Sequence, residues 1–320
     1  MTRAHAKQRG VALVTAMFIV AIVATLATFL AISQQVWLRQ AQNLADLGQA
    51  DGIVRGAIEL AGVALILDAK NTKFDALDEE WSKPVVLPVE GGFVTIEAKD
   101  AQSQFNLNNL VTGTQGNRIL NTTEIAVFEQ LLIELGLDSN LKGALVDWLD
   151  DNSNVEPGGA EDLEYITLST PYRTANGPLE SVDELKRVKG FTPEVIDKLR
   201  PHVIALPVDR GVTPVNVNTA APATLAAVMR ISTAALEAVT GKDQARRFTS
   251  VPDFDKLFPA ATQARGNHNV TTNFFVVTAR VNVGRITRSI DALVERDTGK
   301  IIVHWQQPTR WQIVPDKPDA

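Results

Sequence analysis

The order of apolar and polar residues at the start of the chain predicts a membrane helix. Val11 to Ile32 contains no charged residue and follows a short basic leader that ends in Arg9 and Gly10. About 20 apolar residues carry a helix across the hydrocarbon core of a bilayer. A secretory signal has a shorter apolar stretch, followed by a small-residue cleavage site. Two interpretations therefore stay open: an uncleaved signal anchor, and a helix released from its leader by cleavage after Gly10.

The helical pattern continues beyond the span. Apolar residues recur at roughly helical spacing from Trp37 to Leu65. Gly48, Gly52 and Gly56 lie on one ridge of this helix, although each Gly costs a helix interior up to about 1 kcal/mol relative to Ala. The glycines predict either a close approach of another backbone or a locally loose, bent helix.

Alternating apolar and polar residues predict one early strand and three late ones. An isolated strand cannot bury its apolar face, so we expect the four to form one antiparallel sheet. A turn at residues 297–300 joins the last two strands. The predicted strands are Phe93 to Ala98, Phe275 to Val283, Ile286 to Glu295 and Ile301 to Trp305.

The rest of the chain has the pattern of helices and loops. Residues 71–88 are predicted to be a loop. Ser181 with Glu184 resembles a capping box, and Thr192 and Thr219 precede prolines as helix caps do. The predicted helices are Thr123 to Leu135, Ser139 to Leu149, Ser181 to Val188, Thr192 to Leu206 and Ala221 to Met229.

These elements predict an α+β fold, in which an N-terminal transmembrane helix packs on a small antiparallel β-sheet and a large all-α domain is inserted between strands. We predict a leader at 1–10 and a membrane helix at 11–35. A discontinuous α/β domain comprises 36–105 and 270–320, and the inserted helical domain comprises 106–269.

Composition argues against several classes of function. The chain has no cysteine, which excludes disulfides, thiolate catalysis and Cys-ligated zinc. Its four histidines form no metal-binding motif, and the chain contains no nucleophile elbow or phosphate-binding loop. The net charge of −6 is a poor match for a polyphosphate. We therefore expect neither an enzyme nor a nucleic-acid partner.

One acidic segment has the ligand spacing of a calcium loop. Counting from Asp150, positions 1, 3 and 5 carry oxygen side chains, and position 12 is Glu161. Position 6 is Val155 in place of the Gly that an EF-hand turn requires, so an EF-hand is not predicted. A calcium site of different loop geometry and a solvated acidic loop both stay open. The candidate ligands are Asp150, Asn152, Asn154, Glu161 and Asp162.

Two segments support an alternative function, that of a membrane-anchored helix-hairpin-helix DNA-binding protein in a DNA-uptake system. Val188 to Phe191 and Val215 to Ala220 resemble pieces of helix-hairpin-helix modules, whose hairpin amides grip phosphate. Glu194 and Asp197 follow the first hairpin, however, and the second lacks the glycine turn. The sequence favours a hairpin that contacts protein.

The leader and four further segments together resemble the minor pseudopilin K family of type II secretion systems. The N-terminus is similar to those of type IV prepilins and pseudopilins, with Thr15 at the position where most members carry Glu; the K-type subunit typically lacks this Glu. The resemblance spans essentially the whole chain. The four segments are 76–81 with 88–92, 105–110, 147–162 and 171–176.

This resemblance implies a type IV pilin-like fold and a structural function. A prepilin peptidase would cleave after Gly10, and Val11 would be N-methylated. The mature chain would span the inner membrane once, with its C-terminal domain in the periplasm. It would form the pseudopilus tip and initiate assembly with minor pseudopilins of types I and J. Through other pseudopilins and the secretion apparatus it would help export folded proteins across the outer membrane. The family also implies structural calcium in the inserted domain.

Overall fold

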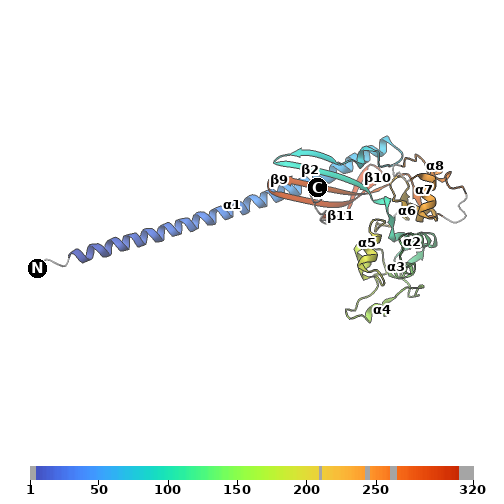
Figure 1. Ribbon diagram of the computed structural model, residues 1–320, viewed down its shortest axis with the longest axis horizontal. Helices are drawn as coiled ribbons and strands as arrows, with labels where there is room; N and C mark the ends of the chain where they lie inside the picture. Colours follow the sequence, from blue (N-terminus) through green and yellow to red (C-terminus); the bar gives the residue numbers. More distant parts are fainter. Residues whose placement is uncertain (1–4, 209–210, 242–245, 260–264, 310–320) are drawn as a thin grey trace, which may run out of the picture. The chain divides into compact units, whose positions relative to one another are not determined.

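The computed structural model describes residues 5–208, 211–241, 246–259 and 265–309, with side chains from residue 11 onward. The chain begins with one continuous helix, α1 (His5–Asn71) (Figure 1). Of the predicted leader, residues 1–4 lie outside the described residues. The cleavage position Gly10 and its neighbour Val11 lie in the early turns of α1.

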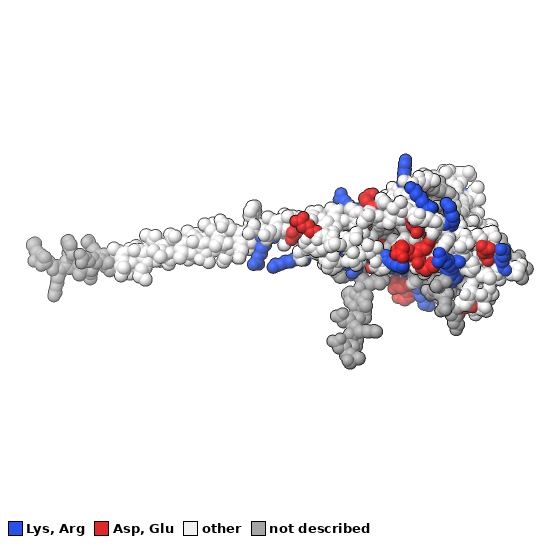
Figure 2. Space-filling view, turned by 90° about the horizontal axis from the view of Figure 1, so that it is seen from above, with Lys and Arg blue, Asp and Glu red and all other residues white. Residues whose placement is uncertain are grey.

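The two halves of α1 differ in their environment. Residues 11–38 of the helix carry no charged side chain and are seen as a white rod in Figure 2. This part is long and apolar enough to cross a membrane, and Trp37 near its end is 70% exposed. Further along, a buried stripe confirms the predicted helical pattern. The stripe comprises Ala50, Val54, Ala57, Ile58, Ala61 and Leu65.

The glycine ridge of α1 does not mark a close backbone contact. A Cβ added at Gly48, Gly52 or Gly56 would meet no atom within 4 Å, so the prediction of close approach is wrong. The close approach lies one and a half turns further on. A Cβ at Gly62 would lie 2.7 Å from Cγ1 of Ile301, so a strand residue fills the space that a side chain would need.

One five-stranded sheet has the order β1-β2-β9-β10-β11, with β10 and β11 antiparallel and a bulge at Leu293/Val294. The early strand and the three late strands are confirmed. β1 falls in the segment predicted to be a loop; it is short, lies at the sheet edge and contains Pro88, which weakens a strand pattern. The strands are β1 (Val85–Val89), β2 (Gly92–Asp100), β9 (Phe274–Val283), β10 (Ile286–Asp297) and β11 (Lys300–Pro308).

The first of two compact units comprises the described parts of Met1–Ala57, Val86–Thr95 and Arg280–Ser289. Within it, α1 is tied to the strands by polar contacts. Arg288 Nε lies 2.9 Å from Asp51 Oδ1, and both side chains are partly exposed.

The second unit comprises the described parts of Ile58–Val85, Ile96–Ala279 and Ile290–Ala320. It contains the insertion between β2 and β9, whose core includes the buried rings of Trp148 and Phe128. Its helices are α2 (Thr122–Glu134), α3 (Leu141–Leu149), α4 (Asp162–Ile166), α5 (Pro193–Leu199), α6 (Pro222–Met229), α7 (Thr233–Thr240) and α8 (Val251–Asp255), with 3-10 turns η1 (Glu80–Ser82), η2 (Ala101–Ser103), η3 (Leu107–Leu110) and η4 (Val182–Arg187).

The insertion also contains three short strand pairs that the helical pattern did not predict. Two are parallel and one is an antiparallel hairpin, and none exceeds four residues per strand. Such short pairings leave little alternation in the sequence. They are β3 (Phe105–Asn106) with β6 (Val203–Ile204), β4 (Val111–Thr114) with β5 (Asn117–Leu120), and β7 (Val215–Asn216) with β8 (His268–Asn269).

Three details of the predicted helices are wrong. The helix predicted to reach Leu206 ends at Leu199, because the chain then enters β6. Ser181 makes no cap: η4 is a 3-10 turn, and Glu184 accepts a hydrogen bond from the amide of Glu180 instead. Thr219 does not cap α6 either; its Oγ1 donates to the buried carboxylate of Asp100. In the first and third cases a tertiary contact replaces the local one.

Candidate metal centre

The acidic segment of residues 147–162, called the acid loop below, connects α3 to α4. Its start is anchored by Trp148, which is 2% exposed and lies edge-on to Tyr165 and Tyr172, with ring centroids 5.5 and 6.3 Å away. α3 ends at Leu149, so Asp150 is the first residue to leave the helix.

Three carboxylates of the acid loop are buried together. Asp147 is fully buried, and its two oxygens accept hydrogen bonds from the amide of Glu156 at 3.1 and 3.3 Å. Asp150 is 1% exposed and accepts from the amide of Asn152. Glu161 is 9% exposed, and its Oε1 is buried without a hydrogen-bond partner. No Lys or Arg pairs with these three carboxylates among the described residues.

Burial and mutual repulsion both raise the pKa values of these three carboxyl groups. Burial raises the pKa of Asp147 to about 6. The pKa of Glu161 is raised to about 7 by burial first and then by the charges of Asp147 and Asp150. The pKa of Asp150 is raised as well, chiefly by burial. The group is therefore poised to gain either protons or a cation at neutral pH.

The other predicted ligands are placed differently. Asn152 turns its amide to Asp150 Oδ2 at 2.8 Å, and its Oδ1 accepts from the amide of Asn154, which is exposed. Asp162 faces away from the group: its carboxylate accepts from the amide and hydroxyl of Thr174 and pairs with Arg173, and the Thr174 bonds lower its pKa. Asn152 thus contacts Asp150, Glu161 lies close enough to respond to the charges of Asp147 and Asp150, and Asp162 is engaged elsewhere.

Asp147 belongs to this buried group of carboxylates but is not among the calcium ligands that the sequence predicts. It precedes Asp150 by three residues, so the two side chains share one face where α3 ends. That spacing could have identified it, although a calcium-loop template starts counting at Asp150.

Glycines let the acid loop fold tightly against α3. A Cβ at Gly143 would collide with the carbonyl oxygen of Pro157, and one at Gly159 would collide with the Asp147 carboxylate. Gly158 has φ +82°, a conformation that glycine adopts without strain. The Pro-Gly-Gly segment therefore holds its backbone against the buried carboxylates.

The first helix-hairpin-helix segment supports the acid loop. Lys189 Nζ lies 2.8 Å from Glu164 Oε1 and 3.3 Å from the carbonyl of Gly159. Nearby, Asp183 accepts from Arg200 at 3.0 Å and lies 3.5 Å from Lys186. Lys186, Lys189 and Arg200, which a DNA-binding hairpin could offer to phosphate, are thus paired with carboxylates of the chain itself. This observation disfavours the DNA-binding alternative.

The chemistry of the acid loop fits a hard divalent cation. Calcium binds carboxylate, amide and carbonyl oxygens, and three buried carboxylates without a partner cation supply that chemistry. The orphaned Oε1 of Glu161 is the atom whose environment is otherwise least favourable.

The apolar N-terminal helix, the antiparallel sheet beside its C-terminal half and the helical insertion define a pilin-like subunit of the minor pseudopilin class. Comparison with known proteins identifies the family. A family model described as type II secretion system (T2SS), protein K, matches residues 103–208. The type II secretion system protein K of Pseudomonas aeruginosa is 32% identical over 313 residues, which are 92% of this chain and 91% of that protein.

Two further relatives agree. The type II secretion system protein K of Pectobacterium carotovorum subsp. carotovorum is 34% identical over 224 residues, 67% of each protein. A solved chain from the crystal structure of the GspK-GspI-GspJ complex of enterotoxigenic Escherichia coli matches with a TM-score of 0.72 and 26% identity, over 85% of this chain and 100% of that one. The chain belongs to the type II secretion system protein K family, which consists of secretion-system components and not of enzymes.

Proposed function

We propose that this chain forms the tip of the periplasmic pseudopilus of a type II secretion system. There it would initiate assembly with minor pseudopilins I and J and help export folded proteins across the outer membrane, without a catalytic role. The observation that carries this proposal is the match to a chain of the Escherichia coli GspK-GspI-GspJ complex over that chain's whole length.

The N-terminal helix suits a single-pass anchor in the inner membrane, with the remaining domain in the periplasm. A prepilin peptidase would cleave after Gly10, and Val11 would become the methylated N-terminus. Val11 is 68% exposed on an uncharged stretch of α1. Removal of the basic leader leaves an apolar helix end, which can enter a bundle of neighbouring anchors within the bilayer.

Thr15 supports a position at an end of the fibre. Its hydroxyl donates to the carbonyls of Val11 and Ala12, so its one donor is used within its own helix. A Thr also carries no negative charge that could attract the terminal amine of a neighbouring subunit. A subunit that offers no such carboxylate fits best where one neighbour is absent.

The insertion between β2 and β9 gives a steric reason for the same position. The two strands are neighbours in the sheet, yet the chain between them forms a domain with its own core. A domain of this bulk would occupy space that a further subunit added to the same end of the fibre would need.

We also propose that calcium binds the acid loop in a structural role. Asp147, Asp150 and Glu161 would hold the ion, with Asn152 beside them. A bound calcium neutralises the buried carboxylates and orders a loop that has few apolar contacts of its own. The ion takes no part in any reaction. The contacts of Lys189 with Glu164 and with the carbonyl of Gly159 would remain as described.

Secretion by a strain that lacks the protein tests the function. Loss of exported enzymes from the culture supernatant, with their accumulation in the periplasm and recovery on complementation, is the expected result. Unchanged secretion would contradict it. The tip position has its own test: quantitative mass spectrometry of sheared fibres should find about one copy per fibre, whereas copies that increase with fibre length would contradict a cap.

A further inference from the structure

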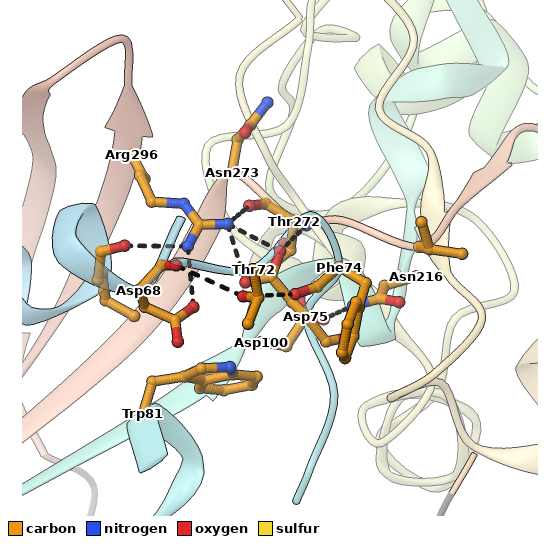
Figure 3. A network of polar contacts seen from close by, with 12 residues as sticks. Asp68, Thr72, Phe74, Asp75, Trp81, Asp100, Asn216, Thr272, Asn273 and Arg296 are labelled. Atoms are coloured by element: carbon orange, nitrogen blue, oxygen red, sulfur yellow. Dashed lines mark hydrogen bonds and ion pairs between the residues drawn. The ribbon is translucent and has the colours of Figure 1, made fainter. Parts of the chain in front are cut away.

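A second group of buried carboxylates lies where α1 ends, far from the acid loop in sequence. Asp68 is in the last turn of α1, Asp75 is in the loop that follows, and Glu79 precedes η1. One carboxylate oxygen of each residue lies within 4.8 Å of one oxygen of each of the other two. These three residues are called the helix-end cluster below, and Figure 3 shows Asp68 and Asp75 beside the guanidinium of Arg296.

Asp75 is the member of the cluster that pairs most closely with Arg296, and among the described residues its Oδ1 accepts only one hydrogen bond. Arg296 Nη2 donates to both of its oxygens at 2.9 and 2.7 Å, and the amide of Thr272 donates to Oδ2 at 2.8 Å. The same guanidinium also donates to the carbonyls of Thr272 and Leu65. Its donors are thus spent on Asp75 and on the backbone, and it neutralises one carboxylate.

The other two members of the cluster each keep a buried oxygen without a hydrogen bond. Glu79 is 9% exposed; its Oε2 accepts from the amide of Ala76 and from Trp81 Nε1, but its Oε1 has no partner. Asp68 Oδ2 also lacks a hydrogen bond, since Arg296 Nη1 is 3.5 Å away. Unpaired buried oxygens of this kind are costly.

The net charge of the cluster and the distances between its oxygens indicate which ion it could bind. Three carboxylates and one guanidinium leave two uncompensated negative charges, and the negative end of the α1 dipole adds to them. A divalent cation balances two charges, whereas one shared proton balances only one. Calcium–oxygen distances of about 2.3–2.6 Å allow ligands up to about 5 Å apart across the ion, but magnesium at about 2.1 Å does not.

We propose that the helix-end cluster is a second calcium site, held by one oxygen each of Asp68, Asp75 and Glu79. Asp68 keeps 16% of its side-chain surface exposed, so water can complete the coordination from that side. The ion would join the end of α1 to the loop that carries Trp81, whose ring packs edge-on against Phe275 with centroids 5.3 Å apart. Without the ion, burial and the charges of Glu79 and Asp75 raise the pKa of Asp68 to about 6.

Calcium binding by the full-length chain in detergent micelles at pH 7.5 tests the proposal. Equilibrium dialysis with radioactive calcium chloride should find one ion fewer per chain in the variant Asp68→Asn/Glu79→Gln than in the wild type. Asp78→Asn is the matched control, because Asp78 lies in the same loop but forms an exposed pair with Arg247. The control should bind as the wild type does. Equal stoichiometry in the cluster variant and the wild type would overturn the proposal.

A second measurement leaves the cluster intact and does not depend on how its variant folds. In the variant Asp150→Asn/Glu161→Gln the acid loop is disabled, so the calcium that remains bound reports on the helix-end cluster alone. Calcium should still raise the Tm of this variant by several degrees. Absence of both binding and shift would show that the cluster holds no calcium, and the proposal would fail while the acid loop remained a separate question.

Discussion

The acid loop and the helix-end cluster bury similar numbers of carboxylates but compensate them differently. In the helix-end cluster Arg296 supplies a fixed cation, which pairs with Asp75 through two hydrogen bonds. In the acid loop, among the described residues, Asp147 and Asp150 accept from backbone amides and from the neutral side-chain amide of Asn152, and neither is paired with a cation. A fixed cation makes a site depend on one side chain, whereas amides leave the charges to be balanced by solution ions. The two sites should therefore respond to different perturbations.

The largest effect is expected from the substitution Arg296→Met. Removing one partner of a buried ion pair leaves an uncompensated charge and costs about 3–5 kcal/mol. Here Asp75, which is 1% exposed, would be left with the Thr272 amide as its remaining donor. The free energy of unfolding of the full chain, measured with urea and tryptophan fluorescence in excess chelator, should fall by that amount.

Arg288→Gln is the control for this experiment. Arg288 and Asp51 form an ion pair of similar length, but both side chains are about 40% exposed. Such pairs contribute about 0–1 kcal/mol. Equal losses in the two variants would mean that burial does not distinguish Arg296, and the contrast between the two sites would disappear.

The second prediction concerns the acid loop and calcium. With calcium at 100 times its dissociation constant, binding to the folded state adds about 2.7 kcal/mol to stability. The variant Asp150→Asn/Glu161→Gln should lose this increment in calcium and should lose nothing in chelator, because it also removes repulsion. Differential scanning calorimetry in both buffers measures the effect. A variant destabilised equally in both buffers would indicate that these carboxylates serve packing alone.

The two sites also differ in how far the sequence reveals them. The acid loop has its carboxylates within one segment, so ligand spacing alone made Asp150, Asn152 and Glu161 candidate ligands. The three carboxylates of the helix-end cluster also lie within one segment, but their counter-ion Arg296 comes from β10. Asp75 and Arg296 are 221 residues apart in sequence. No local pattern reports such a pairing, and the sequence analysis missed it.

The secondary structure also divides into elements that the sequence predicts and elements that it does not. Long periodic elements such as α1 and the β9–β10 hairpin were predicted, because their patterns repeat over many residues. The failures are short elements governed by distant contacts. The helix predicted to reach Leu206 ends earlier, because the chain forms β6 and pairs with β3. Thr219 does not cap α6, because its hydroxyl donates to Asp100. In these places tertiary hydrogen bonds outweigh local propensity.

The third prediction is a pH dependence that calcium suppresses. The pKa of Glu161 is raised from 4.5 to about 7 in the folded protein, so the folded state binds this proton more tightly than the unfolded chain. The resulting stabilisation is fully present below about pH 4.5 and is lost as the pH rises through 7. In chelator, the unfolding free energy should fall by about 2 kcal/mol between pH 5 and pH 8. Urea titrations at several pH values measure it.

Calcium and Glu161→Gln should each flatten this pH profile, the former because the ion competes with protons and the latter because the titrating group is gone. A residual slope in Glu161→Gln is expected from Asp147 and Asp68, whose pKa values are both about 6. A profile unchanged by both treatments would assign the slope to other groups. Protonation of Glu161 would then not be what stabilises the folded state in chelator.

The smallest effect is expected at Glu80, the residue next to Glu79. Its side chain is 88% exposed and pairs with Lys83 at 2.6 Å, three residues along the chain. Such surface pairs contribute below about 0.5 kcal/mol and are screened by salt. Glu80→Gln should therefore leave the urea midpoint and calcium stoichiometry unchanged, whereas Glu79→Gln should lower the stoichiometry. Because the two substitutions remove the same charge one residue apart, a calcium defect in Glu80→Gln would mean that net charge, and not the geometry of the helix-end cluster, attracts the ion.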